Sequence, residues 1–549
     1  MLRPTAPALI ALVLMAQTLD AQVTSERLLN TTNEPQNWLT YSGNYSSTRH
    51  SPLSQIDPSN IDELELKWVF QARSLEKFET TPLVVDGIMY LTEAPNTVVA
   101  LDPVFGRVFW KYEHTPSSES RPCCGRVNRG VAILGETLFM ATIDAQLIAI
   151  DTISGQPIWQ TTVADPTLGY AMTLAPLVID DKVVVGVAGG EFGIRGYISA
   201  FDAATGEEVW RFYTIPGPGE PGHETWEGGG DAWMHGGASV WLTGSYDPEL
   251  NLTYWGIGNP GPDWNPAQRP GDNLYSDSVV ALDADTGELV WHFQFTPGDP
   301  YDYDSVQIAV LADIDIPEFS SGKLMLWANR NGFFYVLDRE TGEFISGEPF
   351  VRVNWASGLD ESGRPIETPQ PLGETTYPCV AGGTNWYSPS YSPSTELFYV
   401  TAWDGCGSVF RPVEVEYRPG QRFLGGRPTS PNPGAPGLAG LERGPINNWT
   451  DERGTGAIIA IDPRTHEHRW RFDMTDVSSS GILTTGANLL FMGSRDGYFH
   501  ALDARSGELL WRTTLGGPFA NGPMTYEAGG SQFVAVASGN GLFVFGLRE

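Results

Sequence analysis

The four cysteines are the residues whose type and spacing point most directly to chemistry. Cys123 and Cys124 are adjacent in the segment RPCCGRVNRG, whereas Cys379 and Cys406 lie 27 positions apart. Four cysteines allow three pairings, and neighbouring cysteines seldom bond because their eight-membered ring strains the intervening peptide. The ordinary expectation for Cys123 and Cys124 is therefore two free thiols, or two disulfide bonds to distant cysteines. Cys379 and Cys406 can close a loop together, which leaves the adjacent pair to each other.

Three further motifs follow the adjacent cysteines along the chain. They read TLAPLVIDDKVVVGVAGGEFGIRGY, GNPGPDWN with the later RPGDN, and TPGDPYDYD. In order, and nearly in spacing, the four motifs resemble the alcohol dehydrogenases that depend on pyrroloquinoline quinone (PQQ), including the large subunit of methanol dehydrogenase. The resemblance covers essentially the whole mature chain. It implies an eight-bladed β-propeller with PQQ and one metal ion at the axis, and an enzyme that oxidises a small alcohol to an aldehyde.

The resemblance also implies a set of cofactor contacts. PQQ is a planar ortho-quinone with three carboxylates, so it needs flat walls, cationic or hydroxyl donors, and a Lewis acid at its reactive carbonyl. A disulfide between Cys123 and Cys124 would cover one face of the quinone, and Trp241 the other, although a lone tryptophan is more often a core residue. The other implied cofactor contacts are Glu79, Arg129, Thr173, Gly189, Gly190, Ser239, Arg330 and Asn385. Arginine suits the carboxylates, and glycine permits close approach of the backbone.

A metal site is the second implication of the resemblance. Glu191 in GGEFG and Asn259 in GNPGP match the family's side-chain ligands, which are oxygen donors of the type that hard cations prefer. Asp302 matches the catalytic aspartate beside the ion. Asp304 occupies a position where the calcium enzyme has a small side chain and the lanthanide-dependent members have aspartate. These residues favour a trivalent lanthanide over Ca²⁺, unless Asp304 points into a blade or caps a turn.

The implied reaction follows from these roles. The metal polarises the quinone carbonyl while Asp302 takes the alcohol proton and the α-hydride passes to the quinone. No CxxCH motif for haem attachment occurs, so we expect the electrons to leave to a separate acceptor such as a soluble cytochrome c. Ser479 stands where methanol dehydrogenase has a tryptophan near the cofactor, so the alcohol itself is not determined.

A repeated hairpin must position these groups. Residues 281–291 read ALDADTGELVW, which is an extended run, an Asp/Thr/Gly turn and a second run that ends on Trp. The pattern recurs at 100–110, 149–159, 200–210, 460–470 and 501–511, and residues 336–346 keep the turn but lose the Trp. Neighbouring repeats roughly 40 to 55 residues apart are typical of four-stranded propeller blades with tryptophan docking motifs. The pattern predicts an all-β fold with seven visible blades; unrelated hairpins are the alternative.

The chain ends are predicted to close the ring. Residues 38–52 and 64–70 read as opening strands, and residues 533–547 as the last strands. If both ends share one blade, neither leaves a bare edge. Residues 354–376 and 412–447 contain too much Pro and Gly for regular strands, so we expect loops that shape access to the centre.

Composition indicates an exported protein. Arg3, the apolar run at residues 8–16 and Ala21 are typical of a signal peptide over residues 1–21, with residues 22–549 as one propeller domain in the periplasm. The apolar run is too short to span a bilayer. The formal net charge of -33 argues against nucleic acid and anionic membranes as partners, and leaves room for a basic protein. A homodimer is compatible with these features.

A non-catalytic propeller that serves as a scaffold in the cell envelope is the alternative function. Such a scaffold would have no use for one particular set of residues, namely Cys123, Cys124, Glu191, Asn259, Asp302 and Arg330. Their joint presence favours the enzyme.

Overall fold

The structure is a computed structural model that describes residues 22–228, 230–316, 322–429 and 453–548. The described chain is nearly all β, with one short helix, α1 (Ser25–Leu29), and several 3₁₀ turns. None of its helices is long and apolar enough to cross a membrane. The predicted signal peptide at residues 1–21 lies outside the described residues.

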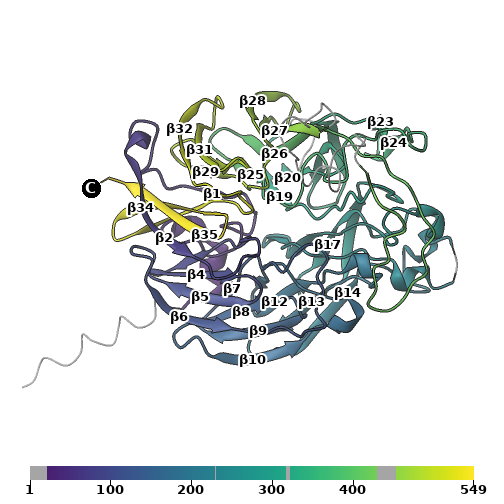
Figure 1. The fold of residues 1–549 in the computed structure, drawn as a ribbon, viewed down its shortest axis with the longest axis horizontal. Helices are drawn as coiled ribbons and strands as arrows, with labels where there is room; N and C mark the ends of the chain where they lie inside the picture. Colours follow the sequence, from purple (N-terminus) through teal and green to yellow (C-terminus); the bar gives the residue numbers. More distant parts are fainter. Residues whose placement is uncertain (1–21, 229, 317–321, 430–452, 549) are drawn as a thin grey trace, which may run out of the picture.

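Antiparallel four-stranded sheets follow one another along the chain and form a ring (Figure 1). The first blade consists of β3 (Leu83–Val85), β4 (Ile88–Glu93), β5 (Thr97–Leu101) and β6 (Val108–Glu113). The second consists of β7 (Ala132–Leu134), β8 (Thr137–Ala141), β9 (Gln146–Asp151) and β10 (Pro157–Thr162). The third consists of β11 (Leu177–Ile179), β12 (Lys182–Gly186), β13 (Tyr197–Asp202) and β14 (Glu208–Tyr213). The fourth consists of β15 (Ser245–Asp247), β16 (Leu252–Gly256), β17 (Ser278–Asp283) and β18 (Leu289–Gln294).

Three more blades continue this order. The fifth consists of β19 (Val310–Asp313), β20 (Lys323–Ala328), β21 (Phe333–Asp338) and β22 (Phe344–Pro349). The sixth consists of β25 (Ser390–Ser392), β26 (Leu397–Cys406), β27 (Arg453–Ile461) and β28 (His468–Met474). The seventh consists of β29 (Leu483–Thr485), β30 (Leu489–Gly493), β31 (Tyr498–Asp503) and β32 (Leu509–Thr514), with β1 (His50–Ser51) added in parallel beside β29.

The eighth blade joins the two ends of the chain. It contains β33 (Met524–Ala528), β34 (Ser531–Ser538) and β35 (Gly541–Leu547), and its fourth strand is β2 (Leu64–Gln71), antiparallel to β35. Figure 1 shows purple β2 beside yellow β35. The structure therefore confirms the eight-bladed propeller and the shared blade predicted for the chain ends.

At six of the eight junctions between the described blades, a turn glycine of one blade docks onto a tryptophan of the blade before it. The Trp210 indole packs against Gly287 in the turn of the next blade, and Trp210 Nε1 donates to the Ala284 carbonyl at 3.1 Å. A Cβ on Gly287 would lie 2.5 Å from the Trp210 ring, so only glycine fits there. The same contact joins Trp68 to Gly106, Trp110 to Gly155, Trp159 to Gly206, Trp291 to Gly342 and Trp470 to Gly507. Because Trp68 lies on β2, this contact also docks the eighth blade onto the first.

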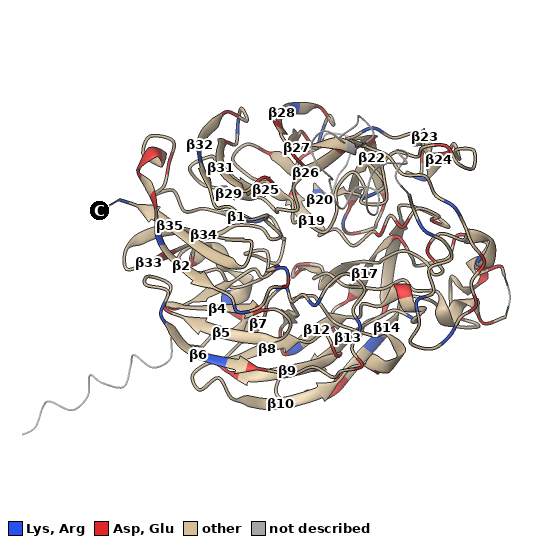
Figure 2. Cartoon of the chain, in the orientation of Figure 1, with Lys and Arg blue, Asp and Glu red and all other residues tan. Residues whose placement is uncertain are grey.

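Burial within a blade falls from the inner strands to the outer one. In the fourth blade β16 and β17 are almost wholly buried, whereas the outer strand β18 alternates between buried and exposed residues. Apolar clusters of buried residues extend across neighbouring blades. Asp and Glu, coloured red in Figure 2, recur around the ring, in keeping with the strongly negative charge.

Two expectations about irregular segments were wrong in part. Of residues 38–52, only β1 is a strand; Trp38 forms an isolated bridge to Val84, and most of the segment between them forms turns and bends. Residues 354–376 contain a small hairpin, β23 (Ala356–Leu359) with β24 (Pro365–Glu367), despite their Pro and Gly. In residues 412–447 the described part, 412–429, has no named strand and only isolated bridges, as expected, and the remainder lies outside the described residues.

We expect Gly287→Ala to lower the melting temperature more than Gly87→Ala. Both glycines have a positive φ, +72° and +82°, so each substitution strains the backbone by about 1 to 2 kcal/mol. Only at Gly287 does the new Cβ meet an indole, whereas at Gly87 nothing lies within 4 Å. The overlap adds a cost on the order of 1 to 3 kcal/mol. Scanning calorimetry of both variants tests the docking contact, and equal shifts would contradict it.

Candidate active site

All the predicted site residues lie on one face of the ring. In each blade the second and fourth strands run in the same direction, so the second-to-third loop and the exit to the next blade share a face. The docking turns lie on the opposite face. The predicted residues all lie in second-to-third loops or in exits to the next blade, and therefore on the face opposite the docking turns. They are Glu79 after β2; Cys123, Cys124 and Arg129 after β6; Thr173 after β10; Gly189, Gly190 and Glu191 after β12; Ser239 and Trp241 after β14; Asn259 after β16; Asp302 and Asp304 after β18; Arg330 after β20; and Asn385 before β25.

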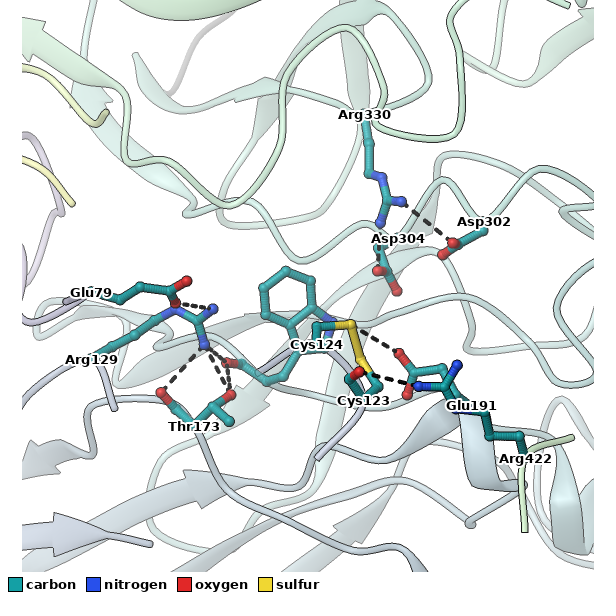
Figure 3. The surroundings of a disulfide bond; sticks show 11 residues. Glu79, Cys123, Cys124, Arg129, Thr173, Glu191, Asp302, Asp304, Arg330 and Arg422 are labelled. Atoms are coloured by element: carbon teal, nitrogen blue, oxygen red, sulfur yellow. Dashed lines mark hydrogen bonds and ion pairs between the residues drawn. A yellow bond between two sulfur atoms is a disulfide. The ribbon is translucent and has the colours of Figure 1, made fainter. Parts of the chain in front are cut away.

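A buried ion pair occupies one side of the site (Figure 3). Arg129 Nη2 lies 2.7 Å from Glu79 Oε2, and Arg129 Nη1 donates to Thr173 Oγ1 at 2.9 Å. Burial raises the pKa of Glu79, and the charge of Arg129 opposes that rise. The guanidinium also lies over two indole rings, 5.2 Å from the Trp241 centroid and 4.6 Å from that of Trp386. Arg129 is therefore held on several sides by the protein.

Both predicted disulfides are present. Cys123 bonds to Cys124, and Cys379 bonds to Cys406. The adjacent pair lies between the Arg129 side and the carboxylate side of the site in Figure 3, and Cys124 Sγ is 3.8 Å from Glu191 Oε1. Because the two sulfurs are bonded to each other, neither is a thiolate available to a metal.

Carboxylates gather on the other side of the disulfide. Arg330 Nη1 lies 2.6 Å from Asp304 Oδ2, and Arg330 Nη2 lies 3.5 Å from Asp302 Oδ2. The Asn259 backbone N–H donates to Asp304 Oδ1 at 2.9 Å. Glu191 is near enough for the charge of Asp304 to act on it. The structure thus brings the four predicted metal ligands and Arg330 into one cluster, and Asp304 points toward it rather than into a blade.

The charges of this cluster are poorly balanced. Burial, together with the negative charge of Asp304, raises the pKa of Glu191 to about 7. Burial and nearby carboxylates also raise the pKa of Asp302 well above its ordinary value, although Arg330 opposes the rise. Buried carboxylates that face one another need a cation or a proton. An oxygen-rich, negatively charged cluster of this kind fits a hard metal ion.

Comparison with known proteins agrees with this geometry. A family of PQQ proteins described as "Glucose/ethanol/alcohol dehydrogenase, beta-propeller domain" matches residues 38–353. The chain belongs to the PQQ-dependent alcohol dehydrogenases. A second family, outer membrane protein assembly factor BamB, matches residues 454–545.

Similar proteins cover nearly the whole chain. Quinoprotein alcohol dehydrogenase PedH of Pseudomonas putida is 36% identical, over 97% of this chain and 91% of that protein. The 1-butanol dehydrogenase (cytochrome c) of Thauera butanivorans is 38% identical, over 92% of this chain and 74% of that protein. A solved europium-containing methanol dehydrogenase matches with a TM-score of 0.85 and 33% identity, over 95% of this chain and 100% of that chain.

Other residues assigned through this family have contacts within the protein. A Cβ on Gly189 would lie 2.3 Å from the Gly169 carbonyl oxygen, and one on Gly190 would lie 3.2 Å from Ser239 Oγ. Packing against protein therefore already favours glycine at position 189. The side-chain amide of Asn385 donates to the Ala381 carbonyl at 2.9 Å and accepts from the Trp386 backbone N–H. Both the nitrogen and the oxygen of this amide are therefore already hydrogen-bonded within its own loop.

The segment 409–429 covers part of this quinoprotein site. The backbone N–H of Phe423 donates to the Glu191 carbonyl at 2.7 Å, and Arg422 Nη2 donates to the Cys123 carbonyl at 3.4 Å. Tyr417 stacks on His235 with ring centroids 3.4 Å apart. The Pro and Gly content of residues 412–447 predicts a loop that shapes access to the centre, but the sequence of the described part, 412–429, gives no indication of these contacts.

The sequence reasoning missed several buried charges beside the predicted cluster. Asp263, Asp277 and Asp299 are almost fully buried, as is Arg269. Arg269 donates to the backbone carbonyls of Asp263, at 3.0 Å, and of Asp299. Asp263 and Arg269 fall within the motifs GNPGPDWN and RPGDN, so the signal was a charged residue inside a motif that already pointed to the site.

We expect Arg129→Met to lower the free energy of unfolding of the metal-free, PQQ-free protein by about 3 to 5 kcal/mol, because it leaves Glu79 buried without a partner. Glu79→Gln should also destabilise, since it leaves Arg129 unpaired. The double variant removes both charges, so it should lose less than the sum of the two single losses. Urea unfolding followed by tryptophan fluorescence measures the cycle. Strictly additive losses would show that the pair is not coupled.

Proposed function

We propose that this quinoprotein is a periplasmic enzyme that oxidises a small alcohol to an aldehyde, with PQQ and one metal ion bound at the face just described. The observation that supports this most strongly is the cluster of Glu191, Asn259, Asp302, Asp304 and Arg330 beside a disulfide of adjacent cysteines. Residues 22–549 would form the single propeller domain, and residues 1–21 the signal peptide.

The residues around Arg129 fit a planar, carboxylated cofactor. Arg129 Nε and Thr81 Oγ1 are buried and have no hydrogen-bond partner among the described residues. Unpaired buried donors of this kind suit the carboxylates of PQQ. Arg129, Thr173 and Ser239 would hold those carboxylates, while the Cys123–Cys124 disulfide and Trp241 would form the flat walls. Asn385 would have to release a contact in its own loop to take part.

Asp302 would act as the general base. PQQ, when bound, supplies the quinone that accepts the two electrons and the α-hydrogen of the alcohol. Asp302 is then placed to accept the hydroxyl proton, which leaves the substrate as an aldehyde. The charge of Arg330 favours the ionised carboxylate that this role requires. Arg330 Nε is itself buried and unpartnered among the described residues, so it remains available for a cofactor oxygen.

The metal ion would be held by Glu191, Asn259, Asp302 and Asp304, and we propose a light lanthanide, with Ca²⁺ as the alternative. Three of these ligands are carboxylates, and burial has already raised the pKa of two of them. A trivalent ion compensates one more negative charge than Ca²⁺ and accepts the same all-oxygen shell. The europium in a methanol dehydrogenase of similar fold supports this choice.

The electrons would pass to a separate, soluble cytochrome c. One relative is named a cytochrome c-linked 1-butanol dehydrogenase, and the net charge of -33 suits a basic partner, whose approach it would steer. A periplasmic location accords with the two disulfides, which persist in oxidising compartments. A homodimer also remains a proposal.

A non-catalytic scaffold of the cell envelope is the second candidate, favoured only by the match to the BamB family. That match covers residues 454–545, which make up the end of the sixth blade and the last two blades and include none of the predicted site residues. The match to the BamB family therefore arises from the repeated blade structure and not from a shared site. Absorbance separates the two functions, because the enzyme loaded with PQQ should show a quinone band and a scaffold should not.

We expect Asp302→Ala to leave PQQ bound but to reduce turnover on the order of 10²- to 10⁴-fold, because positioned proton transfer is lost. Dye reduction measures turnover, and the quinone absorbance measures cofactor content. Asp181→Ala, at an exposed aspartate in the turn between β11 and β12, is the control and should behave as wild type. Near-normal turnover in Asp302→Ala would refute the assignment of the base.

We expect protein reconstituted with PQQ and La³⁺ to be much more active than protein reconstituted with Ca²⁺. Asp304→Asn should reduce this preference selectively, since it removes one charge but keeps an acceptor for the Asn259 N–H. Activity titrations with each ion test both statements. Equal or better activity of the unmutated protein with Ca²⁺ would show that Asp304 does not select a lanthanide.

A further inference from the structure

Asp263 is a buried acid that none of the roles above uses. Its side chain is 2% exposed, and Oδ1 has no hydrogen-bond partner among the described residues. Its backbone carbonyl accepts from Arg269 Nη2 at 3.0 Å, which fixes the chain at this point. A carboxylate buried in this way is costly unless it is paired, protonated or bound to a metal.

No basic side chain of the described protein forms an ion pair with Asp263. The Arg269 guanidinium donates to the Pro262 carbonyl at 3.1 Å and to Asn273 Oδ1 at 2.9 Å, as well as to three more backbone carbonyls. Its hydrogen bonds are therefore directed at the backbone and an amide. The charged groups that act on the Asp263 carboxylate most strongly are Glu191 and Asp304, which are both acidic.

Asp263 also contacts Asn259, four residues earlier in the same motif. The Asn259 side-chain amide interacts with the Asp263 carboxylate, and Asn259 Nδ2 donates to the Pro260 carbonyl at 3.3 Å. An amide nitrogen that faces an anion and a carbonyl leaves the amide oxygen for another partner. An acid at position 263 thus fixes which end of the Asn259 amide is offered to a cation.

We propose that Asp263 is a further acidic residue of the metal site. One carboxylate oxygen orients the amide of Asn259, and the unpartnered oxygen adds negative charge that compensates the charge of the ion. The proposal rests on the metal-dependent function proposed above. With Asp263 the cluster contains four carboxylates, and the Arg330 guanidinium forms ion pairs with only two of them, Asp302 and Asp304.

Asp263→Asn tests the charge with little change of shape, since its amide oxygen can still accept from Asn259. The matched control is Asp277→Asn. Asp277 is equally buried and has two unpartnered oxygens among the described residues. The charges of Asp304 and Asp302 act on Asp277 as well, but Asp277 has no interaction of the kind that joins Asp263 to the Asn259 amide. Any effect of removing a buried charge in general will therefore appear in both variants.

The measurement is metal occupancy rather than activity. PQQ-loaded protein is dialysed against La³⁺ buffered by a chelator, in parallel against Ca²⁺, and bound metal is counted by mass spectrometry. Asp263→Asn should weaken La³⁺ binding by roughly ten- to a hundredfold, as loss of a supporting acid does at other metal sites. Binding of Ca²⁺ should weaken less, because the attraction scales with the charge of the ion. Asp277→Asn should change either affinity by much less.

Melting of the metal-free protein supplies a second readout. If Asp263 serves the metal, Asp263→Asn removes a repelling charge, so the metal-free variant should melt at the same temperature as wild type or higher. A merely structural role would instead lower the melting temperature of the metal-free protein. Lower metal affinity combined with unchanged or higher metal-free stability is therefore the expected signature.

The outcomes separate this inference from the proposed function. Wild-type protein that prefers Ca²⁺ to La³⁺ would overturn the proposed lanthanide, but the loss of Ca²⁺ affinity in Asp263→Asn would still support the role of Asp263. Wild-type affinity for both ions in Asp263→Asn would overturn the inference whatever ion is native. Equal losses in Asp263→Asn and Asp277→Asn would also overturn it, since only the summed charge would then matter.

Discussion

Most junctions between blades depend on one repeated contact, an indole of one blade against a turn glycine of the next. The absence of a side chain on Gly287 lets the Trp210 ring pack against the backbone, and the hydrogen bond from the indole to the Ala284 carbonyl satisfies its buried N–H. The contact sets how neighbouring blades sit against each other. Because Trp68 repeats it between the last blade and the first, groups as distant in sequence as Glu79 and Arg330 meet on one face of the ring.

The sequence predicts seven of the eight blades because their outer hairpins are local. Each contains its own turn, and most end in the docking tryptophan, so short-range patterns are sufficient. The eighth blade has no such hairpin: β2 pairs with β35 from the other end of the chain, and Trp68 lies on β2. The dependence on contacts between distant parts of the chain also explains why the prediction of strands for residues 38–52 was wrong in part. Their aromatic residues suggest strands, yet Trp38 uses its backbone in an isolated bridge to Val84 rather than in a sheet.

The site is predictable where a motif marks it and unpredictable where only burial does. The family resemblance indicated Asp304 and Arg330, but not that Arg330 would pair with Asp304 at 2.6 Å. Asp263 lies inside a motif that the sequence already singles out, but its missing partners are visible only when chain segments far apart are placed together. Nor could Arg422 be linked to Cys123, 299 residues away, since nothing local in either segment indicates the other.

Arg330 lies at different distances from the two aspartates of the carboxylate cluster, and this difference fits the roles proposed for them. Asp304 is proposed only as a ligand of the cation, whereas Asp302 is proposed to accept a proton from the substrate as well. Arg330 lies 2.6 Å from Asp304 but 3.5 Å from Asp302, so it anchors the first and only biases the second toward its ionised form. No basic side chain of the described protein forms an ion pair with Glu191 or Asp263, although Arg422 and Arg269 act on them from farther away. A bound cation would therefore stabilise the folded state as well as serve the reaction, because it binds a cluster that exists only when the ring is closed.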